Sequence, residues 1–306
     1  MNKKNILIFM AKLTSRAEDY SKWYKNGENT KLDLSSKSAR EYVENSLKKW
    51  VLGPDETFKE NVYDDGIDGI RYVYYDNANK EYIANITENL KKYKPDFIGL
   101  QEVDRNTKRS KFRDVVQEMA QELGYHYHYF QKTMDFDKGE FGIAFISKYD
   151  VKNIYIHQLP GKSKEKRQVL AARLNTSKFK KKILVVNTHL DNSLDNKNEE
   201  LDDLFTAIEG FKGDVKFLCG DFNLLPTTEY YAKIRKDWND SYFQGRDLEN
   251  KKNSENRELE TPRIDYVMAK KRTDYKVKKS FYINDDSRDW TKLSDHLPYM
   301  AVFEVE

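Results

Sequence analysis

The chain is predicted to be an α/β protein, and three features of its sequence lead to that class. A strand, a helix and a second strand follow one another over residues 70–100, which is the building unit of α/β proteins. Short apolar runs typical of buried strands recur up to the carboxyl end, and segments with helical spacing lie among them. Apolar residues make up 38% of the 306 residues and charged residues 34%, so the chain can bury a core beneath a charged surface.

The first 68 residues have the weakest pattern. Residues 5–10 resemble a strand, and residues 38–50 have the spacing of an amphipathic helix that ends at Gly53-Pro54. We expect residues 1–68 to be an amino-terminal extension, or an insertion after a first strand, of unknown role. Residues 69–306 then form the main domain, and a chain that lacks residues 1–68 is expected to fold.

From residue 69 onward, strands and helices can be assigned in order. The strands are apolar or rich in β-branched and aromatic residues, and the helices carry apolar residues on one face. Strands are expected at residues 70–75, 97–100, 141–147, 168–174, 183–186, 217–219, 263–268 and 299–305. Helices are expected at residues 81–93, 112–123 and 199–211, and a polar surface loop is expected at residues 239–260.

Composition excludes several classes of protein. The single cysteine, Cys219, excludes an internal disulfide framework and a thiolate zinc cluster. No apolar stretch approaches the ~18 residues that a membrane span needs, so we expect no integral membrane association. Residues 5–10 are too short for a signal peptide and lack a cleavage site, so the protein is expected to be cytoplasmic. The net charge of +3 permits a nucleic-acid partner without requiring one, and oligomeric state is not indicated.

Polar side chains stand at the ends of five predicted strands. Asp221 and Asn223 come directly after the run 217–219 and point to the same side of the chain, because side chains alternate along a strand. Alternatively, these two residues cap a backbone turn. The other polar positions at strand ends are Glu102, Asn187, His189, Asp265, Asp295 and His296.

These strand ends meet if the strands belong to stacked sheets, and they then form a pocket of carboxylates, histidines and amides. Clustered carboxylates repel one another, so a buried set needs a compensating positive charge. A hard cation with oxygen ligands and retained waters, such as Mg²⁺, supplies that charge. Histidines beside carboxylates suit proton transfer and the stabilisation of phosphate charge.

Five short segments resemble the endonuclease/exonuclease/phosphatase superfamily, with its deoxyribonuclease-I-like fold, and they occur in the order found there. The segments are Leu100-Gln101-Glu102, Asn187-Thr188-His189-Leu190-Asp191, Gly220-Asp221-Phe222-Asn223, Ile264-Asp265-Tyr266-Val267 and Ser294-Asp295-His296-Leu297-Pro298. Residues 140–148 and the pair Glu165 and Arg167 are also similar to it. The resemblance covers about residues 69–306 and implies a four-layer αββα sandwich, with two mixed sheets face to face and helices outside.

The resemblance further implies a phosphoester hydrolase that uses a divalent metal, usually Mg²⁺, with Mn²⁺ as an alternative. It implies that Glu102 is the main metal ligand and that Asp295 lies near the metal. Asp221 would orient or deprotonate the attacking water, and Asn223 would hold that water or the phosphate. The remaining implied roles are phosphoryl binding by His189 and His296, acid or base catalysis by His296, orientation of His296 by Asp265 and of His189 by Glu165, and support of the pocket by Asn187.

One position departs from the family pattern. The first strand of the family usually ends in an Asn that helps to bind the metal. Asp76 stands at the usual distance before Glu102, with Asn77 beside it, and we favour Asp76 or Asn77 as the ligand. If residues 5–10 are instead the first strand, Lys12 replaces the Asn, and its charge would oppose a cation.

The favoured function is a phosphodiesterase or nuclease that acts on nucleic acid or nucleotides. The mild positive charge and the lysine-rich stretch at residues 270–279 support this choice. One alternative is a phospholipid or phosphoinositide hydrolase of the sphingomyelinase or inositol-phosphatase kind. Another is a catalytically inactive binding protein of the same fold, and the full set of implied catalytic residues argues against it.

Overall fold

The computed structural model describes residues 4–12, 63–64, 71–72, 87–88, 90–244, 263–283 and 296–305. For residues 63–64, 71–72 and 243–244 it describes the backbone alone. The predicted helix at residues 38–50, most of the predicted loop at residues 239–260, and the candidate ligands Asp76, Asn77 and Asp295 lie outside the described residues.

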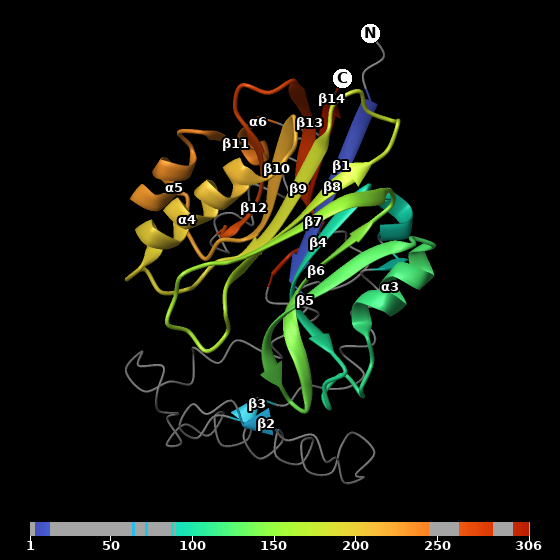
Figure 1. The fold of residues 1–306 in the computed structure, drawn as a ribbon, viewed down its shortest axis with the longest axis vertical. Coiled ribbons are helices and arrows are strands. Elements are labelled where there is room, and N and C mark those ends of the chain that lie inside the picture. The colour runs from blue at the N-terminus through green and yellow to red at the C-terminus, as the bar shows by residue number, and fades with distance from the viewer. Residues whose placement is uncertain are drawn as a thin grey trace, which may run out of the picture.

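Two mixed sheets of six strands lie face to face (Figure 1). The first has the order β13-β14-β1-β4-β6-β5 and the second β11-β12-β10-β9-β8-β7. The strands of the first sheet are β1 (Lys4–Lys12), β4 (Phe97–Arg105), β5 (Tyr127–Phe136), β6 (Gly139–Ser147), β13 (Tyr275–Tyr282) and β14 (Tyr299–Val305). The strands of the second are β7 (Asp150–Gln158), β8 (Gln168–Asn175), β9 (Ile183–His189), β10 (Val215–Asp221), β11 (Trp238–Asp240) and β12 (Asp265–Lys270).

Helices cover the outer faces of both sheets, so the predicted four-layer sandwich is confirmed (Figure 1). Helix α3 (Val115–Leu123) and the helical residues 87–88 and 90–93 lie on the first sheet. Asp114 caps α3 by accepting from the Gln117 N–H, and Gly124 ends it in the left-handed conformation. The second sheet carries α4 (Lys197–Gly210) and α5 (Glu229–Ile234), and the short α6 (Ser241–Gln244) follows β11.

The main core lies between the two sheets. Ile8, Phe97 and Phe145 face inward from the first sheet, and Phe217 and Val267 face them from the second. Each is at most 1% exposed. Burial of a large apolar side chain contributes about 1.5–3 kcal/mol, so this layer holds the two sheets, and the ends of their strands, in a fixed relation.

Strand β1 lies inside the first sheet, which corrects the expected domain boundary. It pairs antiparallel with β14 and parallel with β4, and Ile6, Ile8 and Met10 are fully buried. The boundary at residue 68 therefore does not separate residues 4–12 from the main domain. Removal of residues 1–68 would take away a central strand, so we no longer expect the shortened chain to fold.

The predicted strand at residues 70–75 does not supply the first strand of either sheet. Of its residues, Arg71 and Tyr72 form β3 (Arg71–Tyr72), which pairs with β2 (Tyr63–Asp64) in a separate two-stranded ladder. The sequence pattern at residues 70–75 and at residues 5–10 is equally β-like. Only pairing with β4 and β14, far away in the sequence, distinguishes the two.

Candidate active site

Three polar side chains stand in one row across the second sheet. Asp221, the last residue of β10, is in register with His189 of β9 on one side and with Asp265 of β12 on the other. Because β9 and β10 are parallel, their carboxyl ends coincide, and antiparallel β12 begins at the same edge. Neighbouring strands are about 4.8 Å apart, so the three groups lie within reach of one molecule.

Gly220 is required for the end of β10. Its φ of 146° lies outside the range of other residues, and a Cβ there would come within 1.9 Å of the Thr188 carbonyl oxygen. The chain then turns at Asn223, whose N–H donates to Asp221 Oδ1 at 2.9 Å and whose Nδ2 donates to the Leu190 carbonyl at 2.9 Å. Asp221 therefore caps a turn with Oδ1, while Oδ2 is buried and accepts no hydrogen bond from the described residues.

His296 lies beside this row and contacts two of its carboxylates. Its Nδ1 is 2.9 Å from Asp265 Oδ2 and 3.8 Å from Asp221 Oδ2. Two cationic residues near Asp265 in the sequence pair with other carboxylates: Arg263 with Asp240 and Lys270 with Glu209. Burial lowers the pKa of His296, but the charge and hydrogen bond of Asp265 and the charge of Asp221 together outweigh this and raise the pKa to about 9. The imidazole is therefore protonated at neutral pH.

His189 is held in the opposite protonation state. Arg167 Nη1 donates to His189 Nδ1 at 2.8 Å, which leaves the ring proton on Nε2, 3.6 Å from Asp221 Oδ2. Burial and the charge of Arg167 hold the pKa of His189 well below its usual range. One neutral and one protonated imidazole thus flank Asp221.

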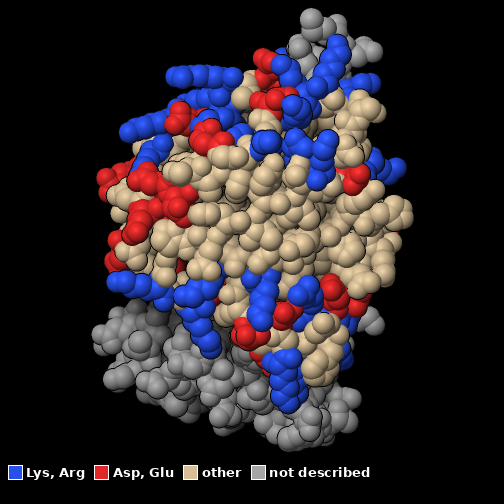
Figure 2. Space-filling view, viewed as in Figure 1, with Lys and Arg blue, Asp and Glu red and all other residues tan. Residues whose placement is uncertain are grey.

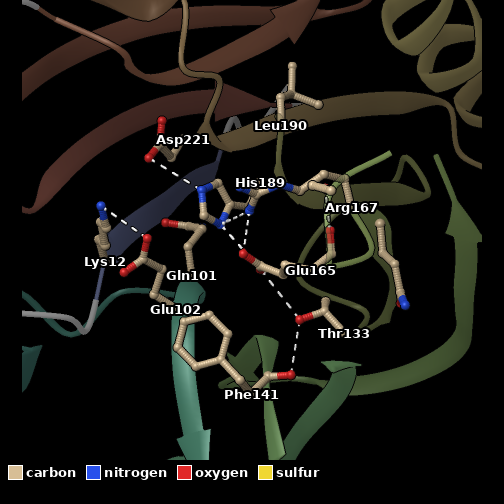
Figure 3. A network of polar contacts seen from close by, with 12 residues as sticks. Lys12, Gln101, Glu102, Thr133, Phe141, Glu165, Arg167, His189, Leu190 and Asp221 are labelled. Atoms are coloured by element: carbon tan, nitrogen blue, oxygen red, sulfur yellow. Dashed lines mark hydrogen bonds and ion pairs between the residues drawn. The ribbon is translucent and has the colours of Figure 1, made fainter. Parts of the chain in front are cut away.

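Glu165 acts on His189 through Arg167 (Figure 3). The same Nη1 of Arg167 donates to Glu165 Oε2 at 2.8 Å, whereas Glu165 Oε1 is 3.7 Å from His189 Nδ1. Burial raises the pKa of Glu165 to about 6, against the opposing charge of Arg167. The predicted pairing of Glu165 with His189 is therefore indirect, and Arg167 is a site residue to which the sequence reading gave no role.

Burial also shifts the titration of Asp221. Burial and the charge of Asp265 raise the pKa of Asp221 to about 7, although His296 and Lys12 act in the opposite direction. Asp221, Asp265 and His296 can each offer a ligand atom, and these atoms lie within 4.8 Å of one another. A carboxylate that titrates near neutral pH is suited to exchange a proton with a bound water.

Glu102 comes from the facing sheet, at a bulge in β4. The register with β6 shifts between Leu100 and Val103, and Glu102 adopts a φ of 54°. A left-handed conformation in a residue other than glycine stores about 1–3 kcal/mol of strain, and such strain is typical of functional sites. Lys12 Nζ lies 3.1 Å from Glu102 Oε1. Figure 3 shows Lys12, Glu102, His189 and Asp221 turned toward the same space.

Asn187, predicted to support the pocket, connects the two sheets. Its Nδ2 donates to the carbonyls of Leu100 and Ala144, each at 2.9 Å, so its Oδ1 must be the acceptor. Gln101 Nε2 donates to that oxygen. Gln101 Oε1 is consequently left as a buried acceptor with no hydrogen bond from the described residues.

The donor atoms of the site fit a hard divalent cation. Gln101 Oε1, Asp221 Oδ2 and Asp265 Oδ1 are buried oxygens without a hydrogen-bond partner among the described residues, and Glu102 adds a fourth oxygen donor. Such oxygens are usually satisfied by a water, an ion or a ligand. The charge of Lys12, whose Nζ contacts Glu102, opposes a metal ion here. Lys12 stands at the end of the first strand, where the family pattern has Asn.

The structure brings together most of the predicted site residues. Glu102, Glu165, Asn187, His189, Asp221, Asn223, Asp265 and His296 line one region where the ends of the two sheets meet. Asp76, Asn77 and Asp295 lie outside the described residues, so their roles stay predictions. Sequence reasoning gave no role to Gln101 or Arg167, although both lie in segments already noted for their family resemblance.

The family model for the Endonuclease/Exonuclease/phosphatase family matches residues 69–296. The match begins after β1, so it does not include the strand that carries Lys12. The comparison with curated proteins finds no relative. Within the described parts of the chain, no helix has the length and apolar character needed to cross a membrane.

Solved structures of this family have the same fold at low sequence identity. An endonuclease/exonuclease/phosphatase from Bacteroides vulgatus is 16% identical with a TM-score of 0.63, over 99% of this chain and 100% of that one. A mannosyl-6-phosphatase from Bacteroides thetaiotaomicron is 17% identical with a TM-score of 0.58, over 97% and 98%. The human Nocturnin catalytic domain, with a bound sulfate anion, is 21% identical with a TM-score of 0.56, over 73% and 86%.

Proposed function

The chain belongs to the endonuclease/exonuclease/phosphatase family of phosphoester hydrolases, and we propose that it hydrolyses phosphodiester bonds in nucleic acid or nucleotides. One observation carries the proposal. Asp221 presents a buried carboxylate oxygen, free of hydrogen bonds from the described residues, between a neutral and a protonated imidazole. This arrangement provides a base for a water molecule and two donors for the oxygens of a phosphoryl group.

Each of these groups has a separate role in the proposed reaction. Asp221 accepts a proton from the attacking water, and its pKa of about 7 makes both protonation states accessible near neutral pH. His189 directs its Nε2 proton toward a phosphoryl oxygen. His296, held by Asp265, supplies a positive charge and a proton for the leaving oxygen. Asn223 fixes the turn that aims Asp221, through its bonds to Asp221 and Leu190.

We propose Mg²⁺ as the metal, with Mn²⁺ as an alternative. Glu102 would hold it, together with Asp295 and with Asp76 or Asn77. When bound, the ion would supply a Lewis acid that stabilises negative charge on the phosphoryl oxygens. The strained backbone of Glu102 supports this assignment, because backbone strain at a bulge is characteristic of ligand-binding positions.

The lysine-rich stretch no longer supports a nucleic-acid substrate. Asp265 is at the site, whereas Lys270 is at the far end of β12, and Tyr275 pairs with Val305 beside the chain termini. Figure 2 shows many Lys and Arg side chains at that end of the molecule. The distance along β12 is about 3.3 Å per residue, so Lys270 is too far away to contact a phosphate at Asp221.

A different feature at the catalytic end supports nucleic acid. The loop after β4 exposes 60% of Phe112, next to Lys111 and Arg113. Lys111 and Phe112 have φ values of 55° and 57°, and the Phe112 N–H donates to the Thr107 carbonyl at 2.8 Å, so the backbone that carries the ring is held in place. An exposed aromatic ring among basic residues suits the stacking of a nucleic-acid base.

A phospholipid substrate is the second candidate. Three exposed apolar side chains lie on loops that follow strands with site residues: Phe112 (60% exposed) after β4, Leu194 (48%) after β9 and Leu225 (40%) after β10. Exposed apolar residues around one site indicate contact with a lipid or another apolar surface. This observation keeps the phospholipid hydrolase as an alternative.

Hydrolysis of a substrate panel in Mg²⁺ tests the proposal. The panel comprises plasmid, single-stranded DNA, RNA, sphingomyelin vesicles, inositol phosphates and a chromogenic diester, with an Asp221→Asn variant as the matched control. We expect cleavage of a nucleic acid and of the diester, and loss of both in the variant. Preferential cleavage of sphingomyelin would support the phospholipid alternative. No cleavage of any substrate would contradict the proposed function.

A further inference from the structure

Lys12 is a buried positive charge at the centre of the site. It ends β1 directly opposite Gln101, and its Nζ lies 3.1 Å from Glu102 Oε1. The two side chains are only 9% and 18% exposed. A pair this buried has lost much of its hydration, so each partner depends on the other for compensation.

The charge of Lys12 acts on the whole pocket. It lowers the pKa of Glu165, His189, Asp221 and His296. With Arg167 and protonated His296, it balances most of the negative charge of Glu102, Glu165, Asp221 and Asp265.

We propose that Lys12 is a resident cation that competes with a divalent metal ion for Glu102. This inference rests on the proposed function, which assigns Glu102 as a metal ligand. Lys12 and the metal ion both require the lone pairs of one carboxylate, and two cations within a few ångströms repel each other. The chain consequently binds its metal at least tenfold more weakly than it would with a neutral residue at position 12.

Metal affinity measured without substrate tests the inference. Mn²⁺ binding is followed by electron paramagnetic resonance of the free ion for the full-length protein and for Lys12→Met, Lys12→Asn and Lys12→Arg. We expect Lys12→Met and Lys12→Asn to bind Mn²⁺ at least tenfold more tightly, equivalent to about 1.4 kcal/mol. Lys12→Arg keeps the charge and should bind as weakly as the natural protein.

Two further variants show where the effect arises. Lys181→Asn is the matched control, because Lys181 pairs with Asp274 at 2.9 Å but is 37% exposed at the other end of β9. It should leave Mn²⁺ affinity unchanged. Addition of Glu102→Gln to Lys12→Met should abolish the gain in Mn²⁺ affinity, because the carboxylate that binds the metal is lost. Circular dichroism and thermal melting verify folding, and Lys12→Gln replaces Lys12→Met if the latter does not fold.

Several results would overturn the inference. Unchanged or weaker Mn²⁺ binding in Lys12→Met would show that the ammonium does not compete. A gain in Lys12→Asn alone would show that the amide adds a ligand and that charge is not the cause. A gain in Mn²⁺ affinity that persists after Glu102→Gln would show that the ion binds elsewhere. Failure of the proposed function is separately visible, because the substrate panel reports hydrolysis independently of how tightly Mn²⁺ binds.

Discussion

Replacement of Asp265 by Asn is expected to convert His296 from a protonated to a largely neutral imidazole at neutral pH. The Asp265 carboxylate lies 2.9 Å from His296 Nδ1. Burial lowers the pKa of His296, but the charge and hydrogen bond of Asp265, with a smaller contribution from Asp221, raise the pKa overall from 6.5 to about 9. One pKa unit corresponds to about 1.4 kcal/mol, so the pair favours the imidazolium by roughly 3 kcal/mol.

The sign of the effect follows from these contributions. Asp265→Asn removes the charge that raises the pKa and leaves the burial that lowers it, so the pKa of His296 falls to 6.5 or below. At pH 7.5 the natural protein is almost fully protonated at His296, whereas the variant is protonated in about a tenth of molecules or fewer. With the additional loss of ring orientation, turnover is expected to fall on the order of a hundredfold.

The assay is the pH dependence of kcat/KM on a chromogenic diester. The natural protein should lose activity as pH falls through about 7, where Asp221 becomes protonated, and as pH rises through about 9, where His296 loses its proton. Asp265→Asn should move the alkaline limit down by two units or more. An NMR titration of His296 measures the same shift without catalysis.

A matched control and a double variant complete the test. Asp203→Asn removes a similar carboxylate, 2.6 Å from His157 on the surface, and should change neither rate nor pH profile. The variant with both Asp265→Asn and His296→Ala should lose little beyond the worse single change, because groups that act as a unit are not additive. Additive losses, or an unchanged alkaline limit in Asp265→Asn, would refute the proposed cooperation.

The remaining predictions concern the metal ligand, the first strand and the exposed ring. Glu102→Gln should remove most activity and Mn²⁺ binding, and full turnover in excess chelator would contradict the metal assignment. Ile8→Ala should destabilise the fold by about 2–5 kcal/mol in denaturant unfolding, because Ile8 is fully buried; a change below 1 kcal/mol would argue against the placement of β1. Phe112→Ala should raise KM for a long single strand severalfold and leave KM for the small diester unchanged; equal effects on both would exclude base stacking.

Much of the second sheet and of the site could be predicted from local sequence. The apolar runs at residues 183–186 and 217–219 lie within β9 and β10, and polar residues at their ends mark where a buried strand reaches the edge of the sheet. This pattern is local, because the length of an apolar run and the polar residues that follow it can both be read along the chain. Strand β7 was not predicted, because it is an edge strand whose exposed side chains interrupt the apolar run.

The sequence by itself therefore determined the α/β class, the order of the family segments and the presence of Glu102, His189, Asp221, Asp265 and His296. Tertiary structure decided which strand comes first and what lies beside Glu102. Strand β1 pairs with β4 and β14 across long stretches of chain, and only this pairing places Lys12 against Glu102. The tertiary structure also decided the side-chain contacts, such as those of Arg167 with Glu165 and His189. Such contacts depend on register and on facing sheets, which no local pattern encodes.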